Sequence, residues 1–365
     1  MNYQDEYRDR ELVQGLAKKL ACLVAGRAKP MTFMEICGTH TMAIYRFGLR
    51  SLLPPEIRLI SGPGCPVCVT PNDYLDRAIA ICRLPQVITA TFGDMMRVPG
   101  SSSSLLAERA RGADIRIVYS PLDAVALSAA NPEKKVVFLG VGFETTAPTV
   151  AASILAAGAR GLTNYFVLAS HKTIPIAMQL LTADPELKLD GYICPAHVSA
   201  IIGADAYRSL AEEFHTPCVI TGFEPADVLQ GIIMLAEQVS AGKSRVEVQY
   251  SRVVRPEGNP KAQAIMAQLF TPCDVPWRGI GVIPGSGLKI NVRYAAFDAE
   301  VMLPVEVEPT LEHAGCCCGE VLRGKMLPAA CPLFASACTP EAPVGACMVS
   351  SEGACAAAYK YGSQG

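Results

Sequence analysis

The sequence lacks any long run of apolar residues, although hydrophobic residues make up 50% of its 365 positions. A membrane-spanning helix needs about 20 consecutive, mostly apolar residues, so we expect no spanning segment. Charge is also scarce: charged residues amount to 18%, the formal net charge is -2, and lysine and arginine form no long run. Because nucleic acids and anionic membranes are bound through basic patches, the sequence argues against both as partners.

An export signal is also missing from the first residues. Residues 1–11 are rich in charge and contain no apolar core followed by a small-residue cleavage site. We therefore expect a cytoplasmic protein. Thiols are kept reduced in the cytoplasm, so structural disulfides are rare there, and the 15 cysteines of this chain indicate metal binding or redox chemistry instead.

Recurring apolar segments indicate the fold class. Short β-branched or apolar runs return about every 25–30 residues, which is the length of one strand plus one crossover helix. They cover residues 32–37, 57–61, 87–91, 115–119, 136–139, 165–169, 191–194 and 218–221. This α/β pattern predicts parallel sheets, either a single eight-stranded barrel or two doubly wound halves. The pattern changes near Gly242, where we place a domain boundary, and residues 1–25 read as an amphipathic helix.

The ends of these predicted strands carry the polar motifs. Ligands of parallel α/β sheets bind at the carboxyl ends of the strands. Cys37 follows the first strand, with His40 three residues later, and His197 follows the seventh. A helix N-terminus and a nearby imidazole both stabilise a thiolate, so Cys37 is a candidate ligand for a soft metal or nucleophile for an electrophile.

A second motif, Cys65-Pro66-Val67-Cys68, follows the second strand after Gly-Pro-Gly. The two sulfurs of a C-x-x-C lie within disulfide reach, so the pair can cycle between dithiol and disulfide. Half of a structural zinc site is the alternative. We favour the redox interpretation because the other closely spaced cysteines belong to a separate cluster.

Two further loops suggest anion binding only weakly. Gly140-Val141-Gly142 follows a strand but lacks the third glycine of a dinucleotide loop, and Glu144 places a negative charge where a pyrophosphate would lie. A role for Glu144 as acid, base or hydrogen-bond partner is favoured over a nucleotide site. Residues 101–104 form a serine run that we interpret as a mobile surface loop.

Seven cysteines are concentrated near the C-terminus, in the set Cys316, Cys317, Cys318, Cys331, Cys338, Cys347 and Cys355. All-thiolate sites at irregular spacing suit an iron-sulfur cluster or zinc. An iron-sulfur cluster is favoured, because four ligands leave surplus cysteines that could form a redox pair beside it. Four cysteines that occur singly are interpreted as small buried hydrophobes: Cys22, Cys82, Cys218 and Cys273. Cys194 is similar, although His197 lies close in sequence.

Together these motifs resemble the HypD family of hydrogenase maturation factors. The resemblance extends from residues 35–40 (Glu-Ile-Cys-Gly-Thr-His) to residues 348–355 (Met-Val-Ser-Ser-Glu-Gly-Ala-Cys), and it includes residues 62–68, 91–100 and 142–149. It implies two doubly wound, Rossmann-like parallel-sheet domains, over residues 1–130 and 131–242. It also implies a C-terminal iron-sulfur domain over residues 243–365, so a barrel is not expected.

The resemblance implies that the protein is a metal-centre assembly scaffold with redox-active thiols rather than a conventional enzyme. The scaffold would build the Fe(CN)2CO unit of NiFe hydrogenases with a HypC-type chaperone and a HypE-type cyanide donor, and would serve the hydrogenase large subunit indirectly. Cys37 would bind iron transiently, and Cys65 and Cys68 would form the redox couple. His40, His197 and Glu352 would be the functional polar residues.

The cluster region of that family is similar to ferredoxin-thioredoxin reductase. The similarity implies that a 4Fe-4S cluster is held by four ligands, Cys316, Cys331, Cys338 and Cys355, with an adjacent Cys318–Cys347 disulfide. The family pattern is Cys-x-Cys-Gly, whereas this sequence adds Cys317, so the choice among the three neighbouring cysteines stays open. Two rival functions remain. A stand-alone iron-sulfur thiol-disulfide oxidoreductase would use the same cysteines, whereas a nucleotide-dependent enzyme would rest on Gly140–Gly142 and the serine run.

Overall fold

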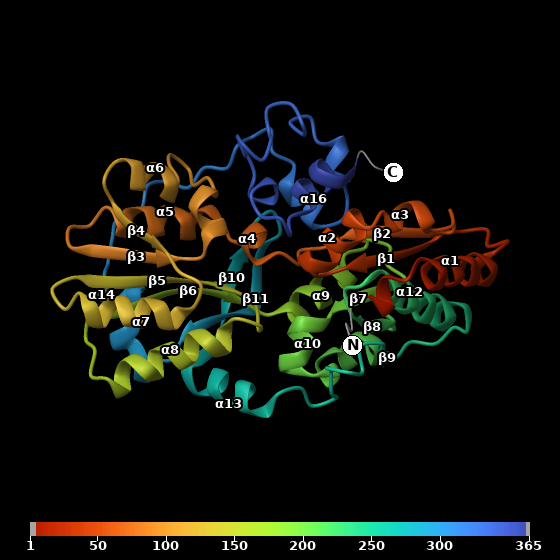
Figure 1. Cartoon of the computed structure of the whole chain (residues 1–365), viewed down its shortest axis with the longest axis horizontal. Helices are drawn as coiled ribbons and strands as arrows, with labels where there is room; N and C mark the ends of the chain where they lie inside the picture. Colours follow the sequence, from red (N-terminus) through yellow and green to blue (C-terminus); the bar gives the residue numbers. More distant parts are fainter. Residues whose placement is uncertain (1–4, 363–365) are drawn as a thin grey trace.

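The computed structural model describes residues 5–362, whose strands form two sheets (Figure 1). Sheet A has the order β2-β1-β7-β8-β9, and all its neighbours are parallel. Its strands are β1 (Met31–Glu35), β2 (Ile57–Ser61), β7 (Gly191–Pro195), β8 (Cys218–Thr221) and β9 (Val246–Val248).

Sheet B has the order β10-β11-β6-β5-β3-β4. Four of its strands run parallel, and the β10–β11 hairpin joins β6 antiparallel. The strands are β3 (Val87–Thr91), β4 (Asp114–Ile117), β5 (Lys135–Gly142), β6 (Tyr165–Lys172), β10 (Phe270–Trp277) and β11 (Gly281–Ile290). All eight predicted strand segments are confirmed, and the two separate sheets exclude a barrel.

Helices cover both faces of each sheet, as their hydrophobic clusters show. One face of sheet A packs on residues of α1 and α12, and Leu20, Ile232 and the β1 side chain Phe33 belong to one hydrophobic cluster there. The helices associated with sheet A are α1 (Arg10–Val24), α2 (Gly38–Arg46), α3 (Leu49–Leu52), α9 (Ile174–Ala183), α10 (Ala196–Ile202), α11 (Arg208–Glu212) and α12 (Pro225–Ser240). Of the helix predicted over residues 1–25, α1 confirms Arg10–Val24; Glu6–Arg8 form a short 3-10 helix, and residues 1–4 lie outside the described residues.

Sheet B is enclosed in the same way. Ala124, Val150 and Ile154 of two helices cover one face, and Leu75 and Ile79 of a third helix belong to the large cluster on the other. The helices of this half are α5 (Asn72–Cys82), α6 (Leu105–Ala110), α7 (Pro121–Ala130), α8 (Ala147–Ala159), α13 (Pro260–Leu269) and α14 (Ala299–Met302). Because the large cluster also includes residues of sheet A, one continuous core joins the two halves.

The two sheets do not follow the sequence boundaries that we expected. Strands β1 and β2 pair with β7 to β9, across the expected division at residue 130, and β9 to β11 lie within the range 243–365 yet belong to the sheets. The chain crosses from sheet A to sheet B after β2 and returns after β6. The division into residues 1–130, 131–242 and 243–365 remains a prediction about domains. Residues 1–130 and residues 131–242 each contribute strands to both sheets.

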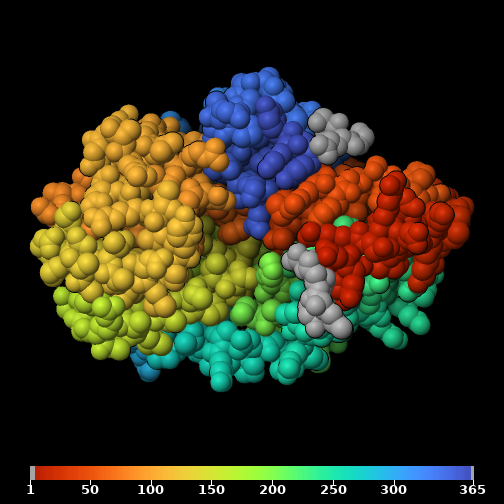
Figure 2. Space-filling view, in the orientation of Figure 1, coloured from red at the N-terminus to blue at the C-terminus, as the bar shows by residue number. Residues whose placement is uncertain are grey.

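The C-terminal segment has little regular structure and lies over the junction of the two halves (Figure 2). Its helices are α15 (Cys318–Leu322) and α16 (Ala354–Tyr361), and it has two short 3-10 helices, η5 (Pro328–Ala330) and η6 (Ala346–Met348). α16 packs against α2, and η6 packs against the short helix α4 (Pro66–Val69). The segment therefore meets the ends of β1 and β2, where two cysteine motifs lie. Across residues 5–362 we find no helix with the length and apolarity needed to cross a bilayer.

Candidate functional site

Cys37 lies between the end of β1 and the first turn of α2, where it is the N-cap residue. The loop after β2 packs directly on it: the Gly38 amide donates to the Gly64 carbonyl at 2.9 Å, and the Gly62 amide donates to the Glu35 carbonyl at 2.8 Å. A β-carbon on Gly64 would overlap the Cys37 backbone. Glycine at position 64 thus lets the two loops touch, and this contact brings the cysteines of both motifs to one place.

The Cys37 thiol is buried, and burial raises its pKa to about 12. The neighbouring Glu352 carboxylate raises the pKa further, while hydrogen bonds from the backbone amides of His40 and Thr39 lower it. The helix N-terminus therefore acts as the sequence predicted, but desolvation outweighs it. An uncomplexed Cys37 is a neutral thiol, and a bound metal ion would supply the charge that deprotonates it.

The expected contact between Cys37 and the His40 imidazole is wrong. His40 is fully buried, and its Nε2 atom lies 2.9 Å from both the Gly222 carbonyl and the Thr221 hydroxyl at the end of β8. Because these partners occupy Nε2 and burial lowers the His40 pKa to about 4, the ring is neutral and anchors α2 to β8. The imidazole therefore does not add positive charge beside Cys37.

His197 and His40 flank the same aromatic ring. Their ring centroids lie 4.2 Å and 4.7 Å from that of Phe223, which follows β8. His197 opens α10 and is exposed, and partial burial lowers its pKa. The two histidines and Cys37 therefore share the carboxyl edge of sheet A, as the sequence predicted.

Cys65 and Cys68 are joined by a disulfide with a Cα–Cα distance of 5.2 Å. Cys65 is the N-cap of α4, and its sulfur accepts from the Cys68 amide at 3.2 Å. Both residues are buried, with exposures of 3% and 0%. The Cys68 sulfur lies 3.9 Å from the Ala346 carbonyl in η6, so this pair touches the segment that contains Cys347.

Glu352 joins the site from the far end of the chain. Its Oε1 atom accepts a hydrogen bond from the Thr39 hydroxyl at 2.6 Å. A β-carbon on Gly38 would lie 2.5 Å from the Glu352 Cβ, so glycine is needed at this position. Burial raises the Glu352 pKa, and the Asp94 carboxylate adds to the rise. Glu352 therefore lies beside Cys37 as a carboxyl group that can hold a proton.

All seven C-terminal cysteines line one cavity, which we call the sulfur cavity. The other residues that line it are apolar or small: Val321, Leu333, Phe334, Gly345 and Met348. Within residues 5–362, no group of three or more histidine, cysteine, aspartate or glutamate side chains is arranged to hold a metal ion. An iron-sulfur cluster makes a different demand, because inorganic sulfide separates the irons that each thiolate binds. The all-sulfur, apolar lining suits such a cluster in its donor atoms.

Within this cavity the cysteines form contacting groups. The sulfurs of Cys318 and Cys347 lie 2.6 Å apart. Cys316 also contacts Cys318, and Cys355 contacts Cys347. Hydrogen bonds with Cys316 and Cys347 lower the pKa of Cys318, and hydrogen bonds with Cys318 and Cys355 raise the pKa of Cys347.

The remaining cysteines lie around these contacts. Cys338 accepts from the Val344 amide at 3.3 Å, and Cys317 forms a hydrogen bond with Cys331. Cys317 therefore lies within reach of a proposed ligand, and the choice among residues 316–318 stays open.

One segment of the chain connects the sulfur cavity to the Cys37 site. Ala346, whose carbonyl faces Cys68, immediately precedes Cys347, and a β-carbon on Gly353 would overlap the Cys347 carbonyl. Gly353 in turn follows Glu352, which bonds to Thr39. The segment from Ala346 to Glu352 thus links the cysteine cavity to the end of β1.

Other predicted residues lie elsewhere. Cys82, Cys194 and Cys218 are buried, but Cys273 is only half-buried and Cys22 is exposed on α1, because the polar side of this helix faces solvent. The predicted Gly140–Gly142 loop is instead the end of strand β5, and a β-carbon on Gly142 would overlap the Thr146 hydroxyl just before α8. The amide and hydroxyl of Ser101 donate to Asp76, so the serine run is anchored at its first residue.

Sequence reasoning missed two buried groups near the site. Glu35 is fully buried at the end of β1, where Thr41 donates to its carboxylate, and burial raises its pKa to about 8. Arg278 is 6% exposed, and its Nε atom donates to the Thr70 carbonyl just after α4. Glu35 could have been found from the sequence, because it is a charged residue at the end of a hydrophobic strand. No local sequence pattern singles out Arg278.

Comparison with known proteins places these residues in a family context. A family model described as "HypD: Hydrogenase formation hypA family" matches residues 11–362. The hydrogenase maturation factor HypD of Rhizobium leguminosarum bv. viciae is 48% identical, over 99% of this chain and 96% of its own length. That of Escherichia coli (strain K12) is 47% identical, over 100% of this chain and 99% of its own length. The HypD protein of Cupriavidus necator is 45% identical, over 99% and 97% respectively.

Proposed function

Because the chain belongs to the HypD family and hence has a role in hydrogenase maturation, we propose that it is the scaffold on which the Fe(CN)2CO unit of NiFe hydrogenases is assembled. The observation that carries the proposal is the meeting of Cys37, the Cys65–Cys68 disulfide and Glu352 at the end of β1. A soft metal ligand, a two-electron thiol couple and a proton-holding carboxyl group are thereby combined in one place.

Cys37 would receive the iron as cargo, since thiolates suit low-spin, soft iron centres. Its thiol must lose a proton on binding, and Glu352, whose carboxyl group lies beside it, would accept that proton. His40 would hold α2 in place through β8, and His197, at the exposed rim of the same edge, would face the incoming partner. The buried His40 would thus position α2, and the exposed His197 would contact the partner protein.

The disulfide would serve as an electron store. On accepting two electrons and two protons, the Cys65–Cys68 bond becomes two thiols beside Cys37. Cys318 and Cys347 would form the matching pair in the sulfur cavity, and the Ala346 carbonyl links the two pairs. Electrons would therefore travel from the Cys318–Cys347 pair to the Cys65–Cys68 pair by way of the segment that contains Ala346 and Cys347.

We propose Cys316, Cys331, Cys338 and Cys355 as the residues that would hold a 4Fe-4S cluster in the C-terminal domain. A cluster bound there would exchange single electrons with the neighbouring thiols. The apolar lining of the cavity would keep water away from the sulfurs, and Cys318 would remain free to pair with Cys347.

The proposed partners are a HypC-type chaperone, a HypE-type cyanide donor and, indirectly, the hydrogenase large subunit. The protein would act in the cytoplasm, without a nucleic-acid or membrane partner. The exposed rim near His197 and the buried Cys37 fit a chaperone that approaches the edge of sheet A and shares the iron with Cys37.

The decisive experiment compares the wild-type chain with Cys37→Ala and Cys82→Ala, each purified anaerobically with the HypC-type partner. Wild type and Cys82→Ala should show cyanide and carbonyl stretches in the infrared spectrum, and Cys37→Ala should lose both the stretches and the associated iron. Cys82 is an apt control because it is buried and bonds only to its own helix, at the Ile79 carbonyl. Retention of the stretches in Cys37→Ala would remove Cys37 from the assembly site.

A stand-alone thiol-disulfide oxidoreductase is the second candidate. The exposures of 3% and 0% for Cys65 and Cys68 oppose it, because a disulfide that serves protein substrates must be reached by their thiols. Rapid reduction of a generic protein disulfide by the chain alone, without the chaperone, would favour this second function instead.

A further inference from the structure

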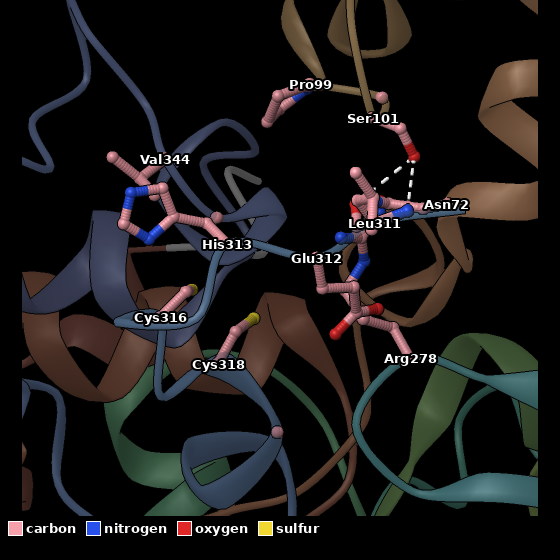
Figure 3. Close-up of a pocket in the computed structure, with 13 residues that line it drawn as sticks. Asn72, Pro99, Ser101, Arg278, Leu311, Glu312, His313, Cys316, Cys318 and Val344 are labelled. Carbon is pink, nitrogen blue, oxygen red and sulfur yellow. Dashed lines mark hydrogen bonds between the residues drawn. The ribbon is translucent and has the colours of Figure 1, made fainter. Parts of the chain in front are cut away.

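A second cavity adjoins the sulfur cavity and is open to solvent (Figure 3). Its volume is about 310 Å³, and we call it the Arg278 cavity. Cys316 and Cys318 lie at its base, and their sulfurs point toward the centre of the view. Cys347 does not line it, so Cys318 is the member of the Cys318–Cys347 pair that this cavity exposes.

Two buried side chains in this cavity each keep one polar atom without a hydrogen-bond partner. Arg278 is anchored through its Nε atom, which donates to the Thr70 carbonyl at 2.8 Å, and its Nη2 atom is left unpaired. Asn72, 4% exposed, donates from Nδ2 to the Leu311 carbonyl at 2.7 Å, and its Oδ1 atom is left unpaired. Buried polar atoms normally find partners, so an unpaired donor and an unpaired acceptor on two residues that line one cavity point to a ligand that these side chains turn to meet.

The charges of the cavity have both signs. Arg278 contributes a guanidinium group. Glu312 contributes a carboxylate and lies next to Leu311 in an exposed segment without regular structure. His313 adds a ring that can donate or accept. A simple anion would pair with Arg278 but would be repelled by the Glu312 carboxylate. A simple cation would be repelled by the Arg278 guanidinium group. A zwitterion that carries both charges suits the whole lining.

We propose that the Arg278 cavity binds the zwitterionic head group of a low-molecular-weight α-amino-acid thiol and presents its sulfur to Cys318. The ligand carboxylate would accept from Arg278 Nη2, and the ligand ammonium group would donate to Asn72 Oδ1 and to Glu312. This inference rests on the proposed function, because it supplies electrons to the Cys318–Cys347 pair of that relay.

The reaction balances as two thiol-disulfide exchanges. The ligand thiolate attacks the Cys318 sulfur of a Cys318–Cys347 disulfide, a ligand–Cys318 mixed disulfide forms, and Cys347 leaves as a thiolate that takes a proton from water. A second ligand thiol attacks the ligand sulfur of the mixed disulfide and releases Cys318. The net result is the oxidation of two ligand thiols to one disulfide and the reduction of the cysteine pair by two electrons.

The first experiment measures binding without redox chemistry. S-methyl-L-cysteine, which has the head group but no thiol, is titrated into the anaerobically purified full-length chain by calorimetry. It should bind to wild type, and more weakly by on the order of tenfold to Glu312→Gln and to Arg278→Gln, because each substitution removes one charge-assisted contact. Glu312 is exposed, so its substitution tests the cavity even if loss of the Arg278 anchor disturbs folding. Absence of binding to wild type would overturn the proposal.

The second experiment measures exchange at Cys318 by mass mapping of the mixed disulfide. L-cysteine is compared with 3-mercaptopropionate, which lacks the ammonium group, with cysteamine, which lacks the carboxylate, and with 2-mercaptoethanol, which lacks both. Each rate is divided by the rate of the same thiol with a small soluble disulfide, to remove intrinsic thiol reactivity. L-cysteine should be favoured by about tenfold over 2-mercaptoethanol in wild type, and Glu312→Gln should reduce its advantage over 3-mercaptopropionate.

The outcomes separate this inference from the proposed function. Equal corrected rates for all four thiols would overturn the cavity assignment but leave the Cys318–Cys347 relay in place. Binding of S-methyl-L-cysteine together with no mixed disulfide from any thiol would retain the cavity and refute the relay. Infrared bands of the iron unit test the assembly function independently of both.

Discussion

Gly64 lies so close to Cys37 that a β-carbon on Gly64 would overlap the Cys37 backbone nitrogen and Cα. The substitution Gly64→Ala must therefore push apart the loops that follow β1 and β2. We expect it to lower the free energy of unfolding by about 1–3 kcal/mol, the usual range for an overpacked site, as measured by urea denaturation.

A matched control for this substitution is Gly15→Ala. Gly15 is an exposed position inside α1, and a β-carbon there would meet nothing within 4 Å. Alanine should raise the free energy of unfolding by about 0.5–1 kcal/mol, because glycine is a poor helix residue. Equal stability of Gly64→Ala and wild type would refute the close contact at Cys37.

Glu144 should make stability depend on pH. Its Oε1 atom accepts from the Ile174 amide at 2.9 Å, its Oε2 atom has no partner, and burial raises its pKa from 4.5 to about 7. The folded state therefore holds a proton that the unfolded state releases above pH 4.5, so this contribution to stability is complete below pH 4.5 and lost as the pH rises through 7.

The substitution Glu144→Gln removes this dependence while keeping an oxygen for the Ile174 amide. Its stability relative to wild type should rise between pH 4.5 and 7, by on the order of 1–3 kcal/mol, in thermal or urea unfolding. Glu133→Gln, at an exposed position, should give a difference that does not change over this range. A flat profile for Glu144→Gln would show that Glu144 is ionised in the folded protein.

The two histidines at the edge of sheet A should differ in their effect on stability. His40→Ala leaves the Thr221 hydroxyl and the Gly222 carbonyl without their partner in a buried place, so we expect a loss of about 1–3 kcal/mol. His197 is exposed, and His197→Ala should change stability by less than about 0.5 kcal/mol. If His197→Ala is destabilised as strongly as His40→Ala, the assignment of His197 to partner contact fails.

The ligand set of the proposed cluster can be tested by serine substitution. Cys331→Ser should lose the visible absorbance and bound iron of the anaerobically purified protein, whereas Cys317→Ser and the distant Cys82→Ser should keep them. Cys317 makes a direct comparison because it contacts Cys331 in the same cavity. Loss of iron from Cys317→Ser together with its retention in Cys316→Ser would exchange the roles of these two residues.

The strands were predictable because their signal is local. Each predicted segment is a short apolar run followed by a helix, and β2, β3 and β8 begin and end at the predicted residues. The partners of the strands were not predictable, because pairing joins residues that no local pattern relates. Phe33 in β1 pairs with Gly191 in β7, although the four strands β3 to β6 of sheet B lie between them in the sequence.

Part of the site was also predictable for a physical reason. Cys37 and Cys65 follow strands that are parallel neighbours, so their loops had to meet at one edge. The arrival of Glu352 and Ala346 at this edge could not be derived from periodicity, since the C-terminal segment has little regular structure. The orientation of His40 was predicted wrongly because a spacing of three residues defines a distance along the helix, whereas the polar groups at the end of β8 decide where the ring points.

The hydrogen bond between Thr39 and Glu352 joins positions that are 313 residues apart. A ribosome makes the first of these positions long before the second, so a growing chain already contains Cys37 while the residues that close over it do not yet exist. An interrupted translation product that stops short of Ala346 would lack both the Glu352 carboxyl group and η6, and hence the complete proposed site for iron. If Cys37 receives iron as proposed, the metal could be loaded only after synthesis of the chain is nearly complete.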